Sequence, residues 1–267
     1  MTREILVVND DSITAEGLVH LVDKLRSYGD VTVVAPKTCN SARSCAITMD
    51  APLHLEHVME REPEGNMGGI RVYTLDGTPV DCAKMGMNMF VEEGRMPDLL
   101  VSGINHGSNA SAAVIYSGTL GAVQEAALYG ITAIGLSIDT HDPHPDFAVV
   151  DEYLDRILTT ILDNPPVEGS YLNINFPDIA PEQVRGIVLA SQGRGRWQKE
   201  LVKANDPRGR EIYWMVGEFV NLAGGGDDAL DDHILLKDGY ITITPHKIDT
   251  TDYGELDRLS QLWDLDL

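Results

Sequence analysis

The sequence has few cysteines and no long apolar run. Its 267 residues include three cysteines, Cys39, Cys45 and Cys82, too few and of the wrong parity for a disulfide framework, and no cysteine or histidine cluster has the spacing of a zinc site. No stretch approaches 18 consecutive apolar residues, which excludes a transmembrane helix. The N-terminus lacks the apolar region and cleavage site of a signal peptide. We therefore expect a cytoplasmic protein with free thiols.

Basic residues are also scarce. The chain has 20 Lys and Arg against 42 Asp and Glu, a formal net charge of −22. A surface of this sign repels polyanions, so we do not expect duplex nucleic acid as a partner. Without a long apolar run, we do not expect a membrane partner either. A small phosphate ester is compatible with the charge, because a bound divalent cation and backbone amides reverse the field locally.

The fold class follows from alternating strand and helix patterns. Apolar runs typical of buried parallel strands occur at 5–8, 31–35, 72–75, 99–102, 132–137 and 171–176. Helical patterns separate most of them, at 18–25, 79–91, 120–129 and 147–162. This order predicts an α/β fold with a three-layer, Rossmann-like core, a mostly parallel sheet and right-handed crossovers. The chain lacks a P-loop motif, and it lacks a glycine-rich dinucleotide fingerprint after the first strand.

The pattern changes after residue 176. Strand-like stretches at 184–190, 211–216 and 240–244 follow without long helices, and the Gly, Arg and Pro residues between them predict a hairpin arm. The last stretch, 251–267, predicts a short helix that docks on another subunit. We therefore expect one domain over 1–267, with a Rossmann-like core at 1–176 and, at 177–267, a β-rich hairpin arm and a C-terminal segment that is swapped or mediates oligomerisation.

Two adjacent carboxylates follow the first predicted strand. Asp10 and Asp11 come directly after Asn9, and parallel sheets bind ligands beyond the carboxyl ends of their strands. Neighbouring carboxylates repel one another unless a cation lies between them, and hard oxygen ligands favour Mg²⁺ or Mn²⁺. The alternative is an ordinary turn, in which Ser12 or Thr14 caps the next helix.

Two further loops carry polar side chains of the same chemical kind. Asn105 and Asn109 follow the strand at 99–102, and their amides can ligate a metal or hold a phosphate oxygen. Ser41 lies in the loop after the second strand. Convergence of such loops at one sheet edge predicts a shared pocket.

A hydroxyl-rich turn precedes the helix near Leu120. Ser117, Gly118 and Thr119 stand where the backbone amides of a helix start can cradle an anion. A simple N-cap by Ser117 or Thr119 is the alternative reading. His106 also lies inside a motif, and it is a candidate acid for a leaving group, although most histidines serve local hydrogen bonds.

Six ordered blocks together resemble the survival protein SurE family over nearly the whole chain. They are 5–11 (ILVVNDD), the Ala35–Pro36 loop with Ser41, 76–82 (DGTPVDC), 97–105 (PDLLVSGIN), 116–119 (YSGT) and 243–245 (ITP). The resemblance implies a divalent-metal-dependent phosphatase that acts as a 5′- and 3′-nucleotidase, with some members trimming short polyphosphate. It also implies a homodimer that exchanges its C-terminal segment, or a homotetramer of such dimers.

The resemblance also assigns the metal ligands. It implies one divalent ion per subunit, Mg²⁺ or Mn²⁺, held by Asp10, Asp11, Ser41 and Asn105. One departure is visible, since the family usually has glycine where this chain has Ser12. If that position takes a positive φ, serine costs about 1 kcal/mol.

The expected reaction is hydrolysis of nucleoside 5′- and 3′-monophosphates by a metal-activated water, as by a 5′-nucleotidase. The catalytic residues are then Asp10, Asp11 and Asn105. The expected phosphate-binding residues are Asn9, Ser41, Asn109, Ser117, Gly118 and Thr119. The alternatives are a non-catalytic metal- or nucleotide-binding protein and a receiver-like regulatory domain, although a receiver needs a phosphorylatable Asp where this chain has Asn105.

Overall fold

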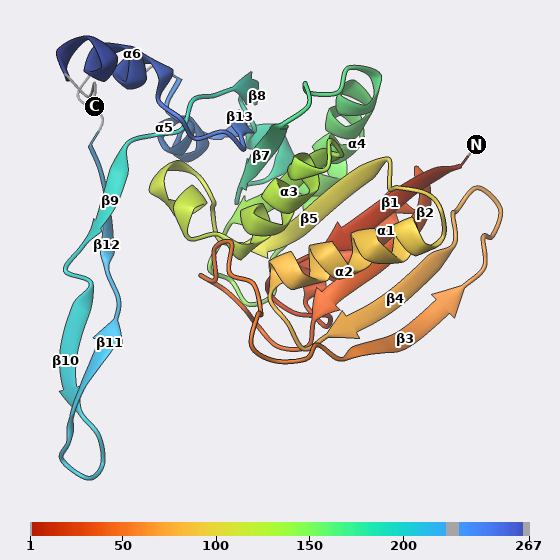
Figure 1. Cartoon of the computed structure of the whole chain (residues 1–267), viewed down its shortest axis with the longest axis horizontal. Helices are drawn as coiled ribbons and strands as arrows, with labels where there is room; N and C mark the ends of the chain where they lie inside the picture. Colours follow the sequence, from red (N-terminus) through yellow and green to blue (C-terminus); the bar gives the residue numbers. More distant parts are fainter. Residues whose placement is uncertain (1, 223–229, 264–267) are drawn as a thin grey trace.

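A nine-stranded sheet forms the centre of the computed structural model, which describes residues 2–222 and 230–263 (Figure 1). Its strands lie in the order β3-β4-β2-β1-β5-β6-β7-β13-β8. Their bounds are β1 (Arg3–Val8), β2 (Gly29–Pro36), β3 (Leu55–Arg61), β4 (Ile70–Leu75), β5 (Leu99–His106), β6 (Thr132–Asp139), β7 (Ser170–Pro177), β8 (Gly186–Leu189) and β13 (Tyr240–Lys247). The six strands from β4 to β7 in this order pair in parallel, whereas β3 and β13 run antiparallel to β4 and β7. The mostly parallel sheet is confirmed.

Two helical layers cover the sheet. They consist of α1 (Glu16–Leu25), α2 (Pro79–Glu92), α3 (Gly118–Leu128) and α4 (Ala148–Asp163). Successive residues of a strand point to opposite faces, and β1 shows the result: Ile5 and Val7 belong to the apolar cluster that includes α1 and α4, whereas Leu6 and Val8 belong to the cluster of α2 and α3. All four side chains are fully buried. The predicted three-layer core is therefore confirmed.

Local sequence explains where α2 begins. Thr78 is its N-cap, Pro79 stands in the first turn, and the Thr78 and Asp81 side chains each accept a hydrogen bond from the other residue's backbone N–H. This capping box satisfies two amides that a helix start leaves unpaired. The short helices η1 (Ser111–Ile115) and η2 (Pro181–Gln183) lie in connections.

The stretch beyond residue 176 both completes the sheet and forms a projecting arm. Strands β8 and β13 join the main sheet. The arm contains two antiparallel pairs, β9 (Gly195–Gln198) with β12 (Glu218–Asn221) and β10 (Leu201–Asn205) with β11 (Glu211–Met215), and it extends well beyond the body (Figure 1). Helix α5 (Asp232–Lys237) packs beside β13. The sequence predicted the arm but not the return of two strands to the sheet.

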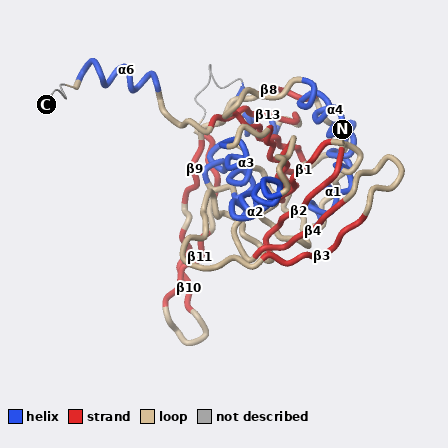
Figure 2. Tube along the Cα trace, turned by 45° about the vertical axis from the view of Figure 1, so that its right-hand side comes forward, coloured by secondary structure: helices blue, strands red, loops and turns tan. Residues whose placement is uncertain are grey.

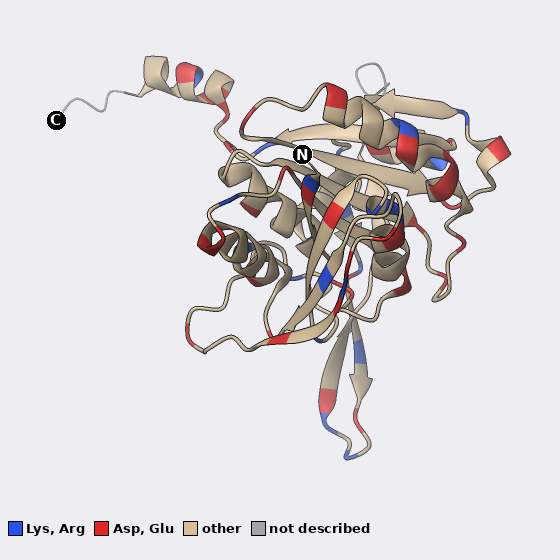
Figure 3. Cartoon of the chain, turned by 90° about the vertical axis from the view of Figure 1, so that its right-hand side faces the viewer, with Lys and Arg blue, Asp and Glu red and all other residues tan. Residues whose placement is uncertain are grey.

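Helix α6 (Tyr253–Leu262) is the predicted terminal helix, and it buries none of its residues. Figure 2 shows it projecting from the body. The end of the predicted segment, 264–267, lies outside the described residues. No described helix is long and apolar enough to cross a membrane. Acidic residues are spread over the helices and loops of the body (Figure 3).

Candidate metal and phosphate site

Hydrogen bonds join three loops at one edge of the sheet. Asn40 lies in the loop after β2, and Asp10 lies in the loop after β1. The backbone amide of Asn40 donates to the carbonyl oxygen of Asp10 at 2.7 Å. The Ser44 amide and hydroxyl donate to the carbonyl oxygens of Tyr116 and Ile115, just before α3, at 3.0 and 2.7 Å. Because β1, β2 and β5 are parallel, their carboxyl ends meet at this edge. The predicted convergence of the loops is therefore observed.

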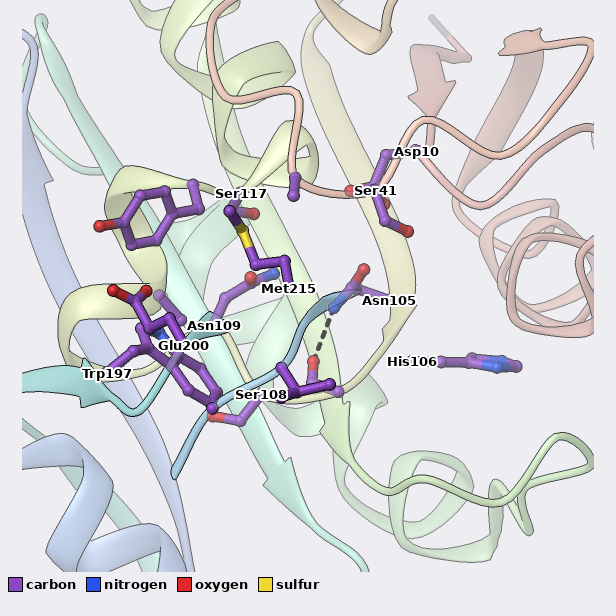
Figure 4. Close-up of a pocket in the computed structure, with 16 residues that line it drawn as sticks. Asp10, Ser41, Asn105, His106, Ser108, Asn109, Ser117, Trp197, Glu200 and Met215 are labelled. Carbon is purple, nitrogen blue, oxygen red and sulfur yellow. Dashed lines mark hydrogen bonds between the residues drawn. The ribbon is translucent and has the colours of Figure 1, made fainter. Parts of the chain in front are cut away.

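A cavity of about 420 Å³ opens between these loops (Figure 4). Five of the predicted site residues line it: Asp10, Ser41, Asn105, Asn109 and Ser117. The other four, Asn9, Asp11, Gly118 and Thr119, are not on its wall. The volume lies within the range of small-ligand pockets.

Asp10 is held by the start of α3. Its side chain is 3 % exposed, and the Thr119 hydroxyl donates to its Oδ1 atom at 2.8 Å. Thr119 therefore contacts Asp10, which accounts for its absence from the cavity wall. Burial and the neighbouring Asp11 carboxylate both disfavour the anion and raise the pKa of Asp10 to about 6.

Asp11 lies beside the next loop. The His106 amide donates to its Oδ2 atom at 3.4 Å. Burial raises the pKa of Asp11 as well, against the opposing effect of His106. Two adjacent carboxyls with raised pKa values fit a site in which a bound cation stabilises both carboxylate anions.

Asn105 presents an oxygen to the same place. Its Nδ2 atom donates to the Gly107 carbonyl oxygen at 2.6 Å, so the amide oxygen is the end turned toward Asp10 and Ser41 (Figure 4). Ser41 is exposed, with its hydroxyl 3.1 Å from the Cys39 sulfur. No group of three or more His, Cys, Asp or Glu within the described part of the chain could hold a metal. The donors here are instead carboxylate, amide and hydroxyl oxygens, which suit a hard divalent cation.

The start of α3 closes the site on another side. The Ser117 hydroxyl accepts a hydrogen bond from the Leu120 amide at 3.1 Å, so Ser117 is the N-cap of α3. The first N–H groups of a helix have no intrahelical partner and attract anions. A Cβ atom at Gly118 would lie 3.0 Å from the Asp10 Cβ and Oδ2 atoms. Glycine therefore allows the helix start to approach Asp10 closely.

Two asparagines of β7, which the sequence reasoning did not single out, support Asn109. The Asn109 amide donates to Asn175 Oδ1 at 2.8 Å, and Asn173 Nδ2 donates to the Asn109 carbonyl oxygen at 2.9 Å. The Asn109 side chain donates to the Ser137 hydroxyl at 2.8 Å. Both β7 asparagines are fully buried. Their signal in the sequence is a pair of polar residues inside an otherwise apolar strand.

Asn9 and His106 do not turn their side chains into the cavity. Asn9 is buried and donates through Nδ2 to the Ser12 carbonyl oxygen at 2.8 Å, which braces the turn after β1. The His106 ring lies 6.2 Å from the Phe147 ring and points away from the cavity (Figure 4). This geometry does not favour His106 as the acid for a leaving group.

The arm contributes cavity residues that sequence reasoning did not assign to the site. Trp197, Glu200 and Met215 line it together with Tyr116. Asp10 and Ser41 lie at one end in Figure 4, and Trp197 and Glu200 at the other. Their presence depends on where the arm leaves the body relative to the sheet edge, which no local pattern reports.

Comparisons with known proteins identify a matching family model, similar sequences and a similar structure. Residues 5–199 match the family model described as "Survival protein SurE". The chain is 38 % identical over 261 residues to "5′-nucleotidase SurE" of Flavobacterium psychrophilum, covering 98 % of this chain and 97 % of that protein. It is 39 % identical over 259 residues to the protein of the same name from Cytophaga hutchinsonii, covering 97 % and 96 %. The crystal structure of the SurE protein from Aquifex aeolicus superposes with a TM-score of 0.78 at 30 % identity, covering 98 % of this chain and all of that one.

Proposed function

The chain belongs to the survival protein SurE family, and on that basis we propose that it is a metal-dependent 5′-nucleotidase. It hydrolyses nucleoside 5′-monophosphates, and 3′-monophosphates as well, to a nucleoside and inorganic phosphate. The observation that carries this proposal is the cavity in which Asp10, Ser41 and Asn105 face the start of α3. Relatives of 38 % and 39 % identity named 5′-nucleotidase support it.

One divalent cation per subunit, Mg²⁺ or Mn²⁺, fits the oxygen donors of Asp10, Asp11, Ser41 and Asn105. The residues fit such an ion because Asp10 and Asp11 are adjacent carboxyls whose anions are disfavoured without one. When bound, the ion supplies charge to the phosphoryl oxygens and lowers the pKa of a water. Asp10, Asp11 and Asn105 are the catalytic residues in this proposal.

Polar groups of the chain, rather than cationic side chains, bind the phosphate in this proposal. None of the cavity-lining residues within the described chain is Lys or Arg. The negative charge of the phosphate is therefore met by the Asn109 and Ser117 side chains on the cavity wall and by the dipole of the helix start, to which Gly118 and Thr119 belong. Ser41 lines the same cavity as Asp10, so in this proposal its hydroxyl serves both the cation and a phosphate oxygen. Asn9 and Thr119 also act indirectly, by holding the turn and the carboxylate of Asp10.

The regulatory and binding alternatives are not favoured. A receiver domain would need an aspartate acceptor at the end of a later strand, and Asn105 occupies that place at the end of β5. A pure nucleotide binder has no need of paired carboxyls beside the phosphate cradle. The family and its relatives favour an enzyme instead.

We also propose a cytoplasmic homodimer or homotetramer. The support is helix α6, which buries nothing within the described chain and exposes Leu256, Leu262 and the adjoining Trp263. Apolar side chains on an unpacked helix are stabilised by a second copy that covers them.

The test is phosphate release from a panel of 5′- and 3′-nucleoside monophosphates with Mg²⁺, Mn²⁺ or EDTA. We expect turnover of the 5′-monophosphates that stops with EDTA and returns when either ion is added in excess. Metal and nucleotide binding without phosphate release from any ester would contradict the proposal and identify a binding protein.

A further inference from the structure

The cavity has two chemically different ends. The end near Asp10 is polar, and the other is formed by Trp197 and Glu200 of the arm, with Met215 between the two ends (Figure 4). We propose that the arm end binds the nucleoside, with the Trp197 indole as the platform on which the base stacks. This inference rests on the proposed nucleotidase function and adds the residue that distinguishes nucleotides from other phosphate esters.

Trp197 is held in place by packing. It lies on β9 opposite Phe219 of β12, and the two rings meet edge to face with their centroids 5.5 Å apart at 70°. Phe219 in turn packs against His233 of α5, at 4.7 Å between ring centroids. The indole nevertheless remains 40 % exposed at the cavity. An aromatic ring fixed on one side and open on another is a suitable surface for a base.

Charge fixes the direction of the substrate. Glu200 lies beside Trp197 in the cavity lining, at the end away from Asp10 (Figure 4). Its carboxylate disfavours a phosphate dianion there, because like charges repel. The start of α3 and the proposed cation attract the phosphate to the other end. The base is therefore directed to the arm.

The cavity also has room for more than phosphate. About 420 Å³ accommodates a group of nucleoside size beside the phosphoryl group. Met215 reaches into it from β11, and its flexible thioether adapts to bases of different shape (Figure 4). Stacking tolerates any base because every base has a π face. The expected preference is thus for nucleotides over base-free esters, rather than for one base.

A neighbouring tryptophan provides a matched control. Trp214 lies on β11 of the same arm and is 62 % exposed, but it does not line the cavity. A general effect of the arm on folding or subunit contacts would involve both tryptophans. An effect on the base should involve Trp197 alone.

The experiment compares kcat/KM for adenosine 5′-monophosphate and for ribose 5-phosphate, with Mn²⁺, in the full-length protein. We expect Trp197→Ala to lower kcat/KM for the nucleotide by about 5- to 150-fold, the equivalent of stacking one base, and to leave ribose 5-phosphate within about twofold. Trp197→Phe keeps an aromatic ring and should retain most of the natural kcat/KM for the nucleotide. Trp214→Ala should leave the ratio of the two substrates unchanged.

A binding measurement gives a second readout. Adenosine should inhibit ribose 5-phosphate hydrolysis competitively, and Trp197→Ala should raise its inhibition constant by a similar factor. An equal loss on both substrates, or no change in either measurement, would overturn the role of Trp197. Absence of metal-dependent hydrolysis in the unsubstituted protein would instead overturn the nucleotidase function itself.

Discussion

Burial of Asp10 determines how the proposed metal site responds to pH. The pKa of this carboxyl is about 6 in the folded chain, above its ordinary value of 3.8. Without a cation, the free energy of unfolding therefore falls as the pH rises through about 6 and Asp10 ionises. A bound cation reverses this cost, because it requires the anion. Metal affinity should accordingly increase as the pH rises through about 6 and then level off.

Thr119 stabilises the ionised form of Asp10, so its removal should weaken metal binding. Thr119→Val removes the hydroxyl that donates to Asp10 Oδ1 at 2.8 Å. Hydrogen bonds to charged groups contribute about 1.5 to 3 kcal/mol, so we expect Mn²⁺ to bind at least tenfold more weakly at pH 7 in isothermal titration calorimetry. Thr119→Ser keeps the hydroxyl and should bind nearly as well as the natural chain. Equal affinity of the valine variant would show that this bond does not matter.

Ser12 is a strained position. Its φ of +130° lies where L-residues are disfavoured, in agreement with the glycine that the resemblance implies there. Ser12→Gly should raise the free energy of unfolding by about 1 kcal/mol, measured by urea denaturation. Ser12→Ala loses the 3.2 Å contact of the hydroxyl with Thr14 but keeps the strain, so it should give no gain. A glycine variant no more stable than the natural chain would refute this explanation.

The sequence predicted which residues meet, but not which way every side chain points. Asp10, Ser41 and Asn105 share a cavity because strand ends can be recognised from apolar runs, and parallel strands end at one edge. Asn9 precedes Asp10 in the sequence and Thr119 follows the Ser117–Gly118 turn, yet their side chains bond to Ser12 and Asp10. Side-chain direction depends on packing between distant segments, which local patterns do not report.

At the scale of elements, the buried strands and their helices were predictable, as was the exposed strand β11, but the exposed strand β3 was not. The runs of β1 and β5 are almost entirely buried, so their apolar residues are continuous. Strand β3 is mostly exposed and carries His57 and Glu60 along an edge, so no apolar run marks it. The pairing of β13 between β7 and β8 joins segments far apart in the chain.

The capping box of α2 gives an acid-dependent contribution to stability. Burial alone would raise the pKa of Asp81, but hydrogen bonds from Thr48 and Thr78 outweigh it and hold that pKa below 3.8. The stability from Asp81 is therefore complete above the unfolded pKa and is lost as the pH falls below it. Asp81→Asn should lower the free energy of unfolding by about 1 to 2 kcal/mol at pH 7.

The measurement is the difference in the free energy of unfolding between the natural chain and Asp81→Asn, followed as a function of pH. Urea unfolding of the two chains should show the gap narrowing below about pH 4, where the carboxyl of the unfolded chain is protonated. Asp50→Asn, at an exposed position in the loop between β2 and β3, should have little effect at any pH. A gap for Asp81→Asn that is independent of pH would mean that the charge of Asp81 is unimportant.

At the scale of the whole molecule, the projecting arm and α6 distinguish this chain from a self-sufficient α/β domain. The arm exposes Tyr213 and Trp214, and α6 exposes Leu256 and Leu262. The sequence predicted an unburied terminal segment, but the number and arrangement of subunits depend on how surfaces fit together. Figures 1 and 2 show both elements standing away from the body.

Removing the terminal segment tests its proposed role in assembly. A chain that ends at Asp249 keeps all nine strands of the main sheet, since β13 ends at Lys247. We expect light scattering to give it a smaller mass than the full chain, because the apolar side chains of α6 no longer cover a second copy. Leu256→Glu in the full-length chain should shift the mass in the same direction. Unchanged mass in both would contradict the proposed contact.

The most direct test is metal-dependent phosphate release by the natural chain and by Asp10→Asn. Both are treated with EDTA and then given Mn²⁺ with adenosine 5′-monophosphate. Asp178→Asn serves as the control, because Asp178 is exposed and follows β7 much as Asp10 follows β1. We expect Mn²⁺ to restore turnover in the natural chain and the control, and Asp10→Asn to retain less than about a hundredth of it. Equal turnover in all three proteins, or turnover that persists in EDTA, would show that Asp10 does not hold a catalytic metal.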